Sequence, residues 1–277
     1  MTPRRVLSLL CLALCAAALV GCGGDTLSFD PVASAANKTV GSQSERVSFT
    51  ATMNVDGVGG MAFSGAGVFD GRTRKGALNM RFTLPPAAQA QLGVSDPTMQ
   101  MIMDGSNGLV MYMRSPLFRT LPADKWVKLD MEKLAKKEGI DLSQVLDAGQ
   151  ADPSQTLQML MASTDAHPVG YDRVRGVFTT HYTLNVDLKR LAKGNSALRD
   201  SYETLTKLTG VDSYPAEAWI DSQGRVRRLK VDISFNGPTG GAFTMSMTED
   251  LYAFGIKVDV RPPDSSQVLD ASALLGG

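Results

Sequence analysis

Regular alternation of apolar and polar residues is the feature that most constrains the fold of this 277-residue chain. Between residues 47 and 55, Val, Phe, Ala, Met and Val alternate with Ser, Thr, Thr and Asn. Successive side chains of a strand point to opposite faces, so this pattern is typical of a strand with one buried face. Further strands are expected at 61–69, 78–84, 99–103, 109–113, 126–129, 177–188, 216–220, 229–235 and 243–247.

Turn residues between these runs indicate antiparallel hairpins. Asp56-Gly57 separates the first two runs, and an Asp-Gly-Ser-Asn-Gly segment occupies 104–108. The Asp-Ser-Gln-Gly segment at 221–224 superficially suggests a calcium loop. The later acidic ligands of such a loop are missing and three arginines follow within four residues, so a hairpin turn is the better interpretation.

Helical signals appear between the strands. Asp130 can cap a helix that ends at Gly139, Asp152-Pro153 can begin a helix carrying Leu157, Leu160 and Met161, and a third helix is expected from Ser196 to Gly210. Antiparallel strands with segregated helices predict an α+β fold. In this fold a curved antiparallel sheet has a few helices covering one face.

The N-terminus resembles a bacterial lipoprotein signal. Arg4 and Arg5 precede an apolar run over 6–20, and Leu-Val-Gly-Cys at 19–22 resembles a lipobox. The resemblance implies a signal peptide over 1–21 and fatty acyl chains such as palmitate on Cys22, which would anchor the protein on the extracytoplasmic face of the cell membrane. An ordinary secretory signal remains an alternative. A transmembrane helix needs about 20 apolar residues, more than this run supplies.

Small and polar residues dominate 22–43, which we expect to be a tether. Asp30-Pro31 resembles a helix start, so a short helix reaching Val40 is the alternative for part of this segment. The folded domain is expected over 44–260, and 261–277, which begins near Pro262-Pro263, is expected to be a flexible tail.

Cysteine usage and charge exclude several classes of protein. Cys11 and Cys15 fall in the expected signal peptide and Cys22 is the expected lipidation site, so the mature chain has no disulfide and no cysteine metal site. Basic and acidic residues number 28 each, and the chain without Arg4 and Arg5 has 26 basic residues, which predicts no basic face for nucleic acid or for anionic lipid headgroups. We expect no metal and no other cofactor.

Methionines occur repeatedly at the apolar positions of the alternation. They could line a cavity for a variable apolar ligand, because methionine is unbranched and adaptable. The sequence alone favours the other interpretation, in which they are ordinary core residues that pack against Leu157, Leu160 and other helix residues, because methionine commonly fills gaps in a core. The candidate cavity residues are Met53, Met80, Met99, Met101, Met111, Met113, Met245 and Met247, with Met103 in the same pattern.

Catalytic patterns do not emerge from the sequence. The two histidines are His167, before a proline, and His181, on the polar side of its alternating run. No nucleophile-elbow, zinc-protease or P-loop motif accompanies them, so we expect a protein that is not an enzyme.

Two short segments carry a family resemblance. Asp-Lys-Trp-Val-Lys-Leu at 124–129 and Ala-Trp-Ile-Asp-Ser-Gln-Gly-Arg-Val at 218–226 are similar to segments of the LppX/LprG-type lipoproteins of actinobacteria and, more remotely, of the carrier LolA. The resemblance implies a U-shaped half-barrel with helices over its concave face, enclosing an apolar cavity that holds lipid or glycolipid tails in some members. It assigns no ligand residue in this sequence.

Two functions follow from these observations. The first is a lipid-anchored protein that binds a lipid or another apolar ligand in the half-barrel and transports it across the cell envelope. The alternative is an interaction or sensor lipoprotein with a filled core that acts through a protein partner. An open apolar cleft of several hundred Å³ favours the first function.

Overall fold

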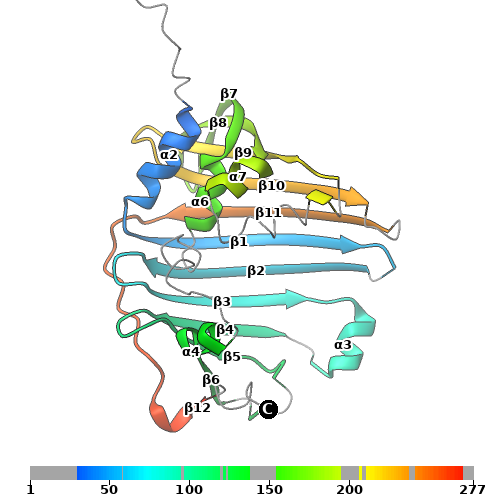
Figure 1. Ribbon diagram of the computed structural model, residues 1–277, viewed down its shortest axis with the longest axis vertical. Coiled ribbons are helices and arrows are strands. Elements are labelled where there is room, and N and C mark those ends of the chain that lie inside the picture. The colour runs from blue at the N-terminus through cyan, green and yellow to red at the C-terminus, as the bar shows by residue number, and fades with distance from the viewer. Residues whose placement is uncertain are drawn as a thin grey trace, which may run out of the picture.

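One open sheet of twelve strands organises the molecule (Figure 1). The computed structural model describes residues 30–57, 59–94, 97–118, 121–122, 124–137, 154–194, 206–207, 210–236 and 241–270. The strand order is β12-β6-β5-β4-β3-β2-β1-β11-β10-β9-β8-β7. Every neighbouring pair is antiparallel except β12 with β6. The predicted α+β class and open half-barrel architecture are confirmed.

The strands run through nearly the whole described chain. They are β1 (Ser44–Val55), β2 (Gly59–Asp70), β3 (Lys75–Thr83), β4 (Thr98–Asp104), β5 (Val110–Arg114), β6 (Trp126–Asp130), β7 (Ser163–Val174), β8 (Val177–Asp187), β9 (Ser213–Asp221), β10 (Val226–Asn236), β11 (Ala242–Tyr252) and β12 (Val268–Asp270). The helices are α2 (Pro31–Val40), α3 (Pro86–Leu92), α4 (Met131–Lys137), α6 (Ser154–Met161) and α7 (Leu188–Gly194), with a 3-10 turn, η3 (Ser265–Gln267).

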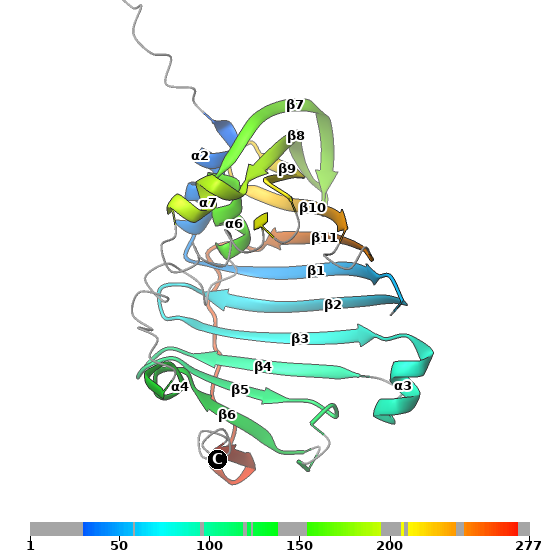
Figure 2. The same cartoon turned by 45° about the vertical axis from the view of Figure 1, so that its right-hand side comes forward.

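Three helices cover one end of the sheet. Figures 1 and 2 show α2, α6 and α7 together in front of β7 to β11, whereas α4 lies at the other end beside β5 and β6. The core joins Val32 of α2 and Leu160 of α6 to Val186 of β8, Leu229 of β10 and Leu251 of β11. The core therefore lies between these helices and β7–β11, together with the start of β1.

Helix α2 corrects the expected tether. Asp30 caps the helix by accepting hydrogen bonds from the backbone N–H groups of Val32 and Ala33, and Pro31 occupies its first turn. Val32 and Ala36 are completely buried in the core. The alternative of a short helix reaching Val40 is therefore confirmed, and residues 30–43 are not a tether, because a short turn alone separates the helix from the first residue of β1.

Other differences concern elements whose local pattern is weak. The sequence expectations did not include β7, α3 or α7. The expected flexible tail is wrong for residues 265–270, because η3 is followed by β12 and β12 pairs in parallel with β6. The helices predicted after Asp130 and after Asp152 are confirmed as α4 and α6. Most of the helix expected over 196–210 lies outside the described residues.

A buried hydroxyl joins α2 to the sheet. The Thr39 hydroxyl donates to the Ala35 carbonyl at 2.7 Å and accepts from the Val226 backbone N–H at 2.8 Å. Thr39 and Val226 are both completely inaccessible to solvent. This hydroxyl therefore satisfies the first backbone N–H of β10 from a helix 187 residues away in the chain.

We expect Thr39→Val to lower the free energy of unfolding by about 1–3 kcal/mol, because it keeps the shape of the side chain and leaves the buried Val226 N–H without an acceptor. Thr39→Ser, which keeps the hydroxyl, is the matched control. Urea unfolding of both variants measures the difference. Equal stability of Thr39→Val and the parent would show that α2 does not pack on the sheet as described.

Candidate apolar binding face

The methionines predicted to line a cavity share one face of the sheet. Residues directly opposite each other in neighbouring strands point to the same side. Met53 of β1 faces Met61 of β2 and Met245 of β11, Gly65 of β2 faces Met80 of β3, and this parity continues through β4 and β5. We call this side the methionine face; it carries Met53, Met61, Met80, Met99, Met101, Met103, Met111, Met113, Met245 and Met247, with Phe49, Phe63, Phe82, Phe235 and Phe243.

The core and the methionine face are two regions of the same side of the sheet. Val47 and Leu251, which belong to the core, are paired across β1 and β11 with the same parity as Met53 and Met245. All eight candidate methionines are half-buried, and none belongs to the core cluster formed by the described residues. Their side chains thus lie outside the core, on the same side of the sheet.

Two clefts lie along this face. The larger, about 920 Å³, is lined by Met53, Met61, Ile233 and Met245 and by residues 210–215, which precede and begin β9. Polar residues of the same strands also line this cleft, among them Thr52, Asn54, Asp232, Ser234, Thr244 and Ser246. The smaller, about 270 Å³, is nearly all apolar and is lined by Val47, Phe49, Phe69, Leu78, Met101 and Met103, with the carboxylate-bearing Glu249. Five of the predicted cavity residues share the face but line neither cleft: Met80, Met99, Met111, Met113 and Met247.

Gly65 makes room for the aromatic ring of Phe49 on the methionine face. The Phe49 ring lies over Gly65 of the neighbouring strand, and a Cβ at residue 65 would come within 2.6 Å of that ring. The same ring meets Phe63 edge-on, with a centroid separation of 6.2 Å. Gly65 therefore lets Phe49 spread across two strands, which extends the apolar surface of the methionine face.

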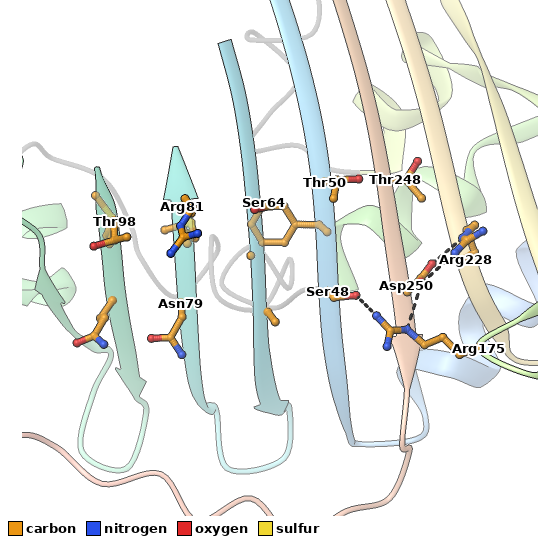
Figure 3. Close-up of a pocket in the computed structure, with 16 residues that line it drawn as sticks. Ser48, Thr50, Ser64, Asn79, Arg81, Thr98, Arg175, Arg228, Thr248 and Asp250 are labelled. Carbon is orange, nitrogen blue, oxygen red and sulfur yellow. Dashed lines mark hydrogen bonds and ion pairs between the residues drawn. The ribbon is translucent and has the colours of Figure 1, made fainter. Parts of the chain in front are cut away.

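The opposite face of the sheet carries a polar groove of about 680 Å³, which the sequence expectations did not include (Figure 3). Hydroxyl and amide side chains line it together with Phe49, Met80 and Met99. Arg175 and Arg228 lie at one end. Arg228 Nε lies 2.6 Å and Arg175 Nε 3.1 Å from the two oxygens of Asp250. Arg175 comes from the β7–β8 turn, so no local pattern in the sequence could have placed it beside β11.

Both histidines are engaged with polar partners. His181 lies on the face opposite the methionines, where its Nε2 is 2.7 Å from Glu217 Oε2 and its ring stacks on Trp219 at 4.2 Å. Burial opposes ionisation of Glu217, but hydrogen bonds from Lys230 and His181 outweigh it and lower the pKa of this carboxyl. His167 Nε2 contacts the Thr183 hydroxyl at 3.1 Å.

The 221–224 segment forms the predicted hairpin turn. Asp221 Oδ1 accepts from the backbone N–H groups of Gln223 and Arg225, while Oδ2 accepts from the guanidinium groups of Arg225 and Arg227. Burial raises the pKa of Asp221, but these hydrogen bonds outweigh burial and hold the pKa below its ordinary value. Within the described ranges, no group of three or more His, Cys, Asp or Glu residues is arranged to hold a metal ion.

The ion pairs of Asp221 predict a pH-dependent contribution to stability. Because the folded pKa is lowered, the contribution is present above the unfolded pKa of about 3.9 and is lost as the pH falls through the folded value. We expect Asp221→Asn to cost roughly 2–3 kcal/mol at neutral pH. The difference from the parent should shrink below about pH 4 in urea unfolding measured across pH. A difference that stays constant down to about pH 2 would contradict the ion-pair account.

The anchor predicted at Cys22 lies outside the described residues. Within the part of the chain that the structure covers, no helix combines the length and apolar character needed to cross a membrane.

Comparisons with known proteins give distant similarities. No protein-family model matches the chain. An uncharacterized 31.2 kDa protein of Streptomyces griseus is 28% identical over 156 residues, which cover 54% of this chain and 49% of the relative. The chain therefore matches about half the length of this curated relative.

The solved structures that this chain matches include LppX-type lipoproteins and a LolA superfamily protein, the two groups that the sequence resembles. LprF from Mycobacterium bovis is 13% identical with a TM-score of 0.44, covering 84% of this chain and 95% of LprF. The Mycobacterium tuberculosis lipoprotein LppX is 12% identical with a TM-score of 0.44, covering 84% of this chain and all of LppX. A LolA superfamily protein from Nitrosomonas europaea is 10% identical with a TM-score of 0.30, covering 86% of this chain and 95% of that protein.

Proposed function

We propose that this protein is a lipid-anchored, non-enzymatic protein of the cell envelope that binds the acyl chains of a lipid or glycolipid on the methionine face and carries them across the envelope. One observation carries the proposal: methionine and phenylalanine side chains from neighbouring strands gather on one half-buried face beside open clefts.

The dimensions and chemistry of the face suit acyl chains. Ligand sites are typically clefts of about 300–1,000 Å³ with mainly apolar walls. The volume of the larger cleft falls in this range, with Asp212 and Asp232 among its lining residues, and the smaller cleft supplies the more apolar wall. Each methylene transferred from water to such a wall contributes about 0.8 kcal/mol. Methionine thioethers adjust to chains of different length and unsaturation, because they are flexible and polarizable. The site therefore suits long apolar ligands as a class and is not specific for a single molecule.

The lipobox supports the envelope location. Two acyl chains suffice for stable anchoring where a single chain gives marginal binding, and a lipidated Cys22 would carry at least two. Residues 22–29 would then connect the membrane to Asp30 at the start of the folded domain.

We expect lipid to co-purify with the mature protein and to be detected by native mass spectrometry. Met53→Asp, which places a carboxylate in the larger cleft, should reduce bound lipid about tenfold or more, because an acyl chain cannot solvate a charge. Thr50→Asp is the matched control: it lies on the same strand, is exposed, and points to the polar face. This control should keep its lipid.

A different outcome favours the alternative function. Absence of lipid from the parent, with equal fluorescent fatty-acid binding by Met53→Asp and Thr50→Asp, would contradict lipid binding at the methionine face. Capture of a protein partner by the parent, lost in Met53→Asp, would instead support an interaction lipoprotein.

Lipidation at Cys22 is tested separately. We expect Cys22→Ala to abolish metabolic labelling with palmitate and to prevent cleavage after residue 21, because the thioether forms on the Cys22 thiol. Intact-mass measurement of the membrane and soluble fractions reads both effects. A Cys22→Ala protein that is cleaved and retained in the membrane like the parent would contradict the anchor.

A further inference from the structure

Exposed apolar side chains concentrate on the β7–β8 hairpin. Of the five large apolar side chains exposed among the described residues, three belong to it: Val169 is 51%, Tyr171 75% and Phe178 57% exposed. The rings of Tyr171 and Phe178 stack with a centroid separation of 5.8 Å. The Arg173 guanidinium lies 5.6 Å from the Phe178 ring centroid. The hairpin thus presents two aromatic rings and a cation together.

The pairing of the hairpin puts these groups on one side. Tyr171 faces Thr180 and Arg173 faces Phe178, so the side chains of all four share a side. Asp172, the acidic residue between Tyr171 and Arg173, faces Thr179 on the other side. Because β7 is the last strand of the sheet, its outer edge has no neighbouring strand among the described residues.

The chain enters the domain at this end of the molecule. Asp30 Oδ2 accepts a hydrogen bond of 2.6 Å from the hydroxyl of Ser163, the first residue of β7. Figures 1 and 2 show α2 and the β7–β8 hairpin together at one end of the long axis, with β12 at the opposite end. An anchor upstream of Asp30 is therefore attached to the end that bears the aromatic hairpin.

The length of the connecting segment limits how the domain can sit. Eight peptide units separate Cys22 from Asp30, so they span about 29 Å at most. The eleven strand-to-strand steps from β7 to β12 measure about 53 Å along the sheet. A protein anchored at Cys22 consequently keeps Asp30, at the β7 end of the sheet, within about 29 Å of the bilayer.

We propose that the β7–β8 hairpin docks on the surface of the lipid bilayer through Tyr171 and Phe178, with Arg173 beside them. Aromatic side chains favour the boundary between headgroups and acyl chains. The guanidinium of Arg173 matches lipid phosphates, to which it can form charge-assisted hydrogen bonds. The hairpin would act with the Cys22 anchor as a second contact that fixes the orientation of the domain. The inference rests on the anchor in the proposed function and is independent of lipid binding by the methionine face.

The test attaches the domain to vesicles without natural lipidation. The chain from residue 22, with Cys22→Ser and an N-terminal hexahistidine tag, is bound to nickel-chelating vesicles of phosphatidylcholine and phosphatidylglycerol. Tyr171→Trp introduces a reporter at the hairpin, and Asn107→Trp, in the turn between β4 and β5, is the exposed control. The parent, with Trp126 and Trp219, supplies the background fluorescence.

We expect brominated phospholipids to quench about half of the added fluorescence of Tyr171→Trp, because the reporter would sit at the interface, and to leave that of Asn107→Trp unchanged. Adding Phe178→Ser to Tyr171→Trp should reduce the quenching. Equal quenching at residues 171 and 107, no quenching at 171, or quenching that Phe178→Ser does not reduce would each overturn the proposal.

The result of this quenching experiment does not depend on the results of the tests of the proposed function. The tag replaces the acyl anchor, so a failure of lipidation at Cys22 does not affect this measurement. Loss of co-purified lipid in Met53→Asp reports on the methionine face and is unaffected by the hairpin. Tyr171 and Phe178 are exposed, so their replacement leaves the core intact, which a far-ultraviolet spectrum checks.

Discussion

The continuous pairing of strands through β1 is the constraint on which the rest of the structure depends. Met53 of β1 faces Met61 on one side and Met245 on the other, so one strand sets the parity for both halves of the sheet. A shift of one residue would move every apolar side chain of β1 to the polar face. The helix-covered core and the clefts lie on the same side because this register is maintained from β5 to β10.

Local pattern predicts most strands, but it fails where the strand itself is irregular. The structure shows two shifts of register in β7, around residues 164–167 and 168–170, where Pro168 and Gly170 also interrupt the alternation. Helix α2 has clear start signals at Asp30 and Pro31, yet its small residues resemble a tether. The burial of Thr39 depends on Val226, which is distant in the sequence, so composition near residue 39 could not predict it.

Local sequence pattern also predicts one part of the candidate site, whereas the rest depends on contacts between distant segments. Alternation placed the methionines on one side, and the register agrees residue by residue. The larger cleft could not be predicted, because its walls combine β1, β2 and β11 with residues 210–215. The arginine cluster of the polar groove likewise arises because the β7–β8 turn brings Arg175 to Asp250 of β11. Curvature of the whole sheet, and not any one segment, creates such neighbours.

The path of the last described residues has a consequence for biosynthesis. After β11, the chain passes the start of β1, where the Gly255 N–H donates to the Ser44 carbonyl, and then runs to the far edge of the sheet (Figure 1). There β12 covers β6, and Lys125 donates to the Ser266 carbonyl. β1 pairs with β11 and β6 pairs with β12, and both partner strands lie near the C-terminus. A nascent chain therefore keeps two unpaired strand edges until synthesis is almost finished. Open edges pair with other strands, so a chain of this fold that is truncated before β11 or β12 is prone to aggregate.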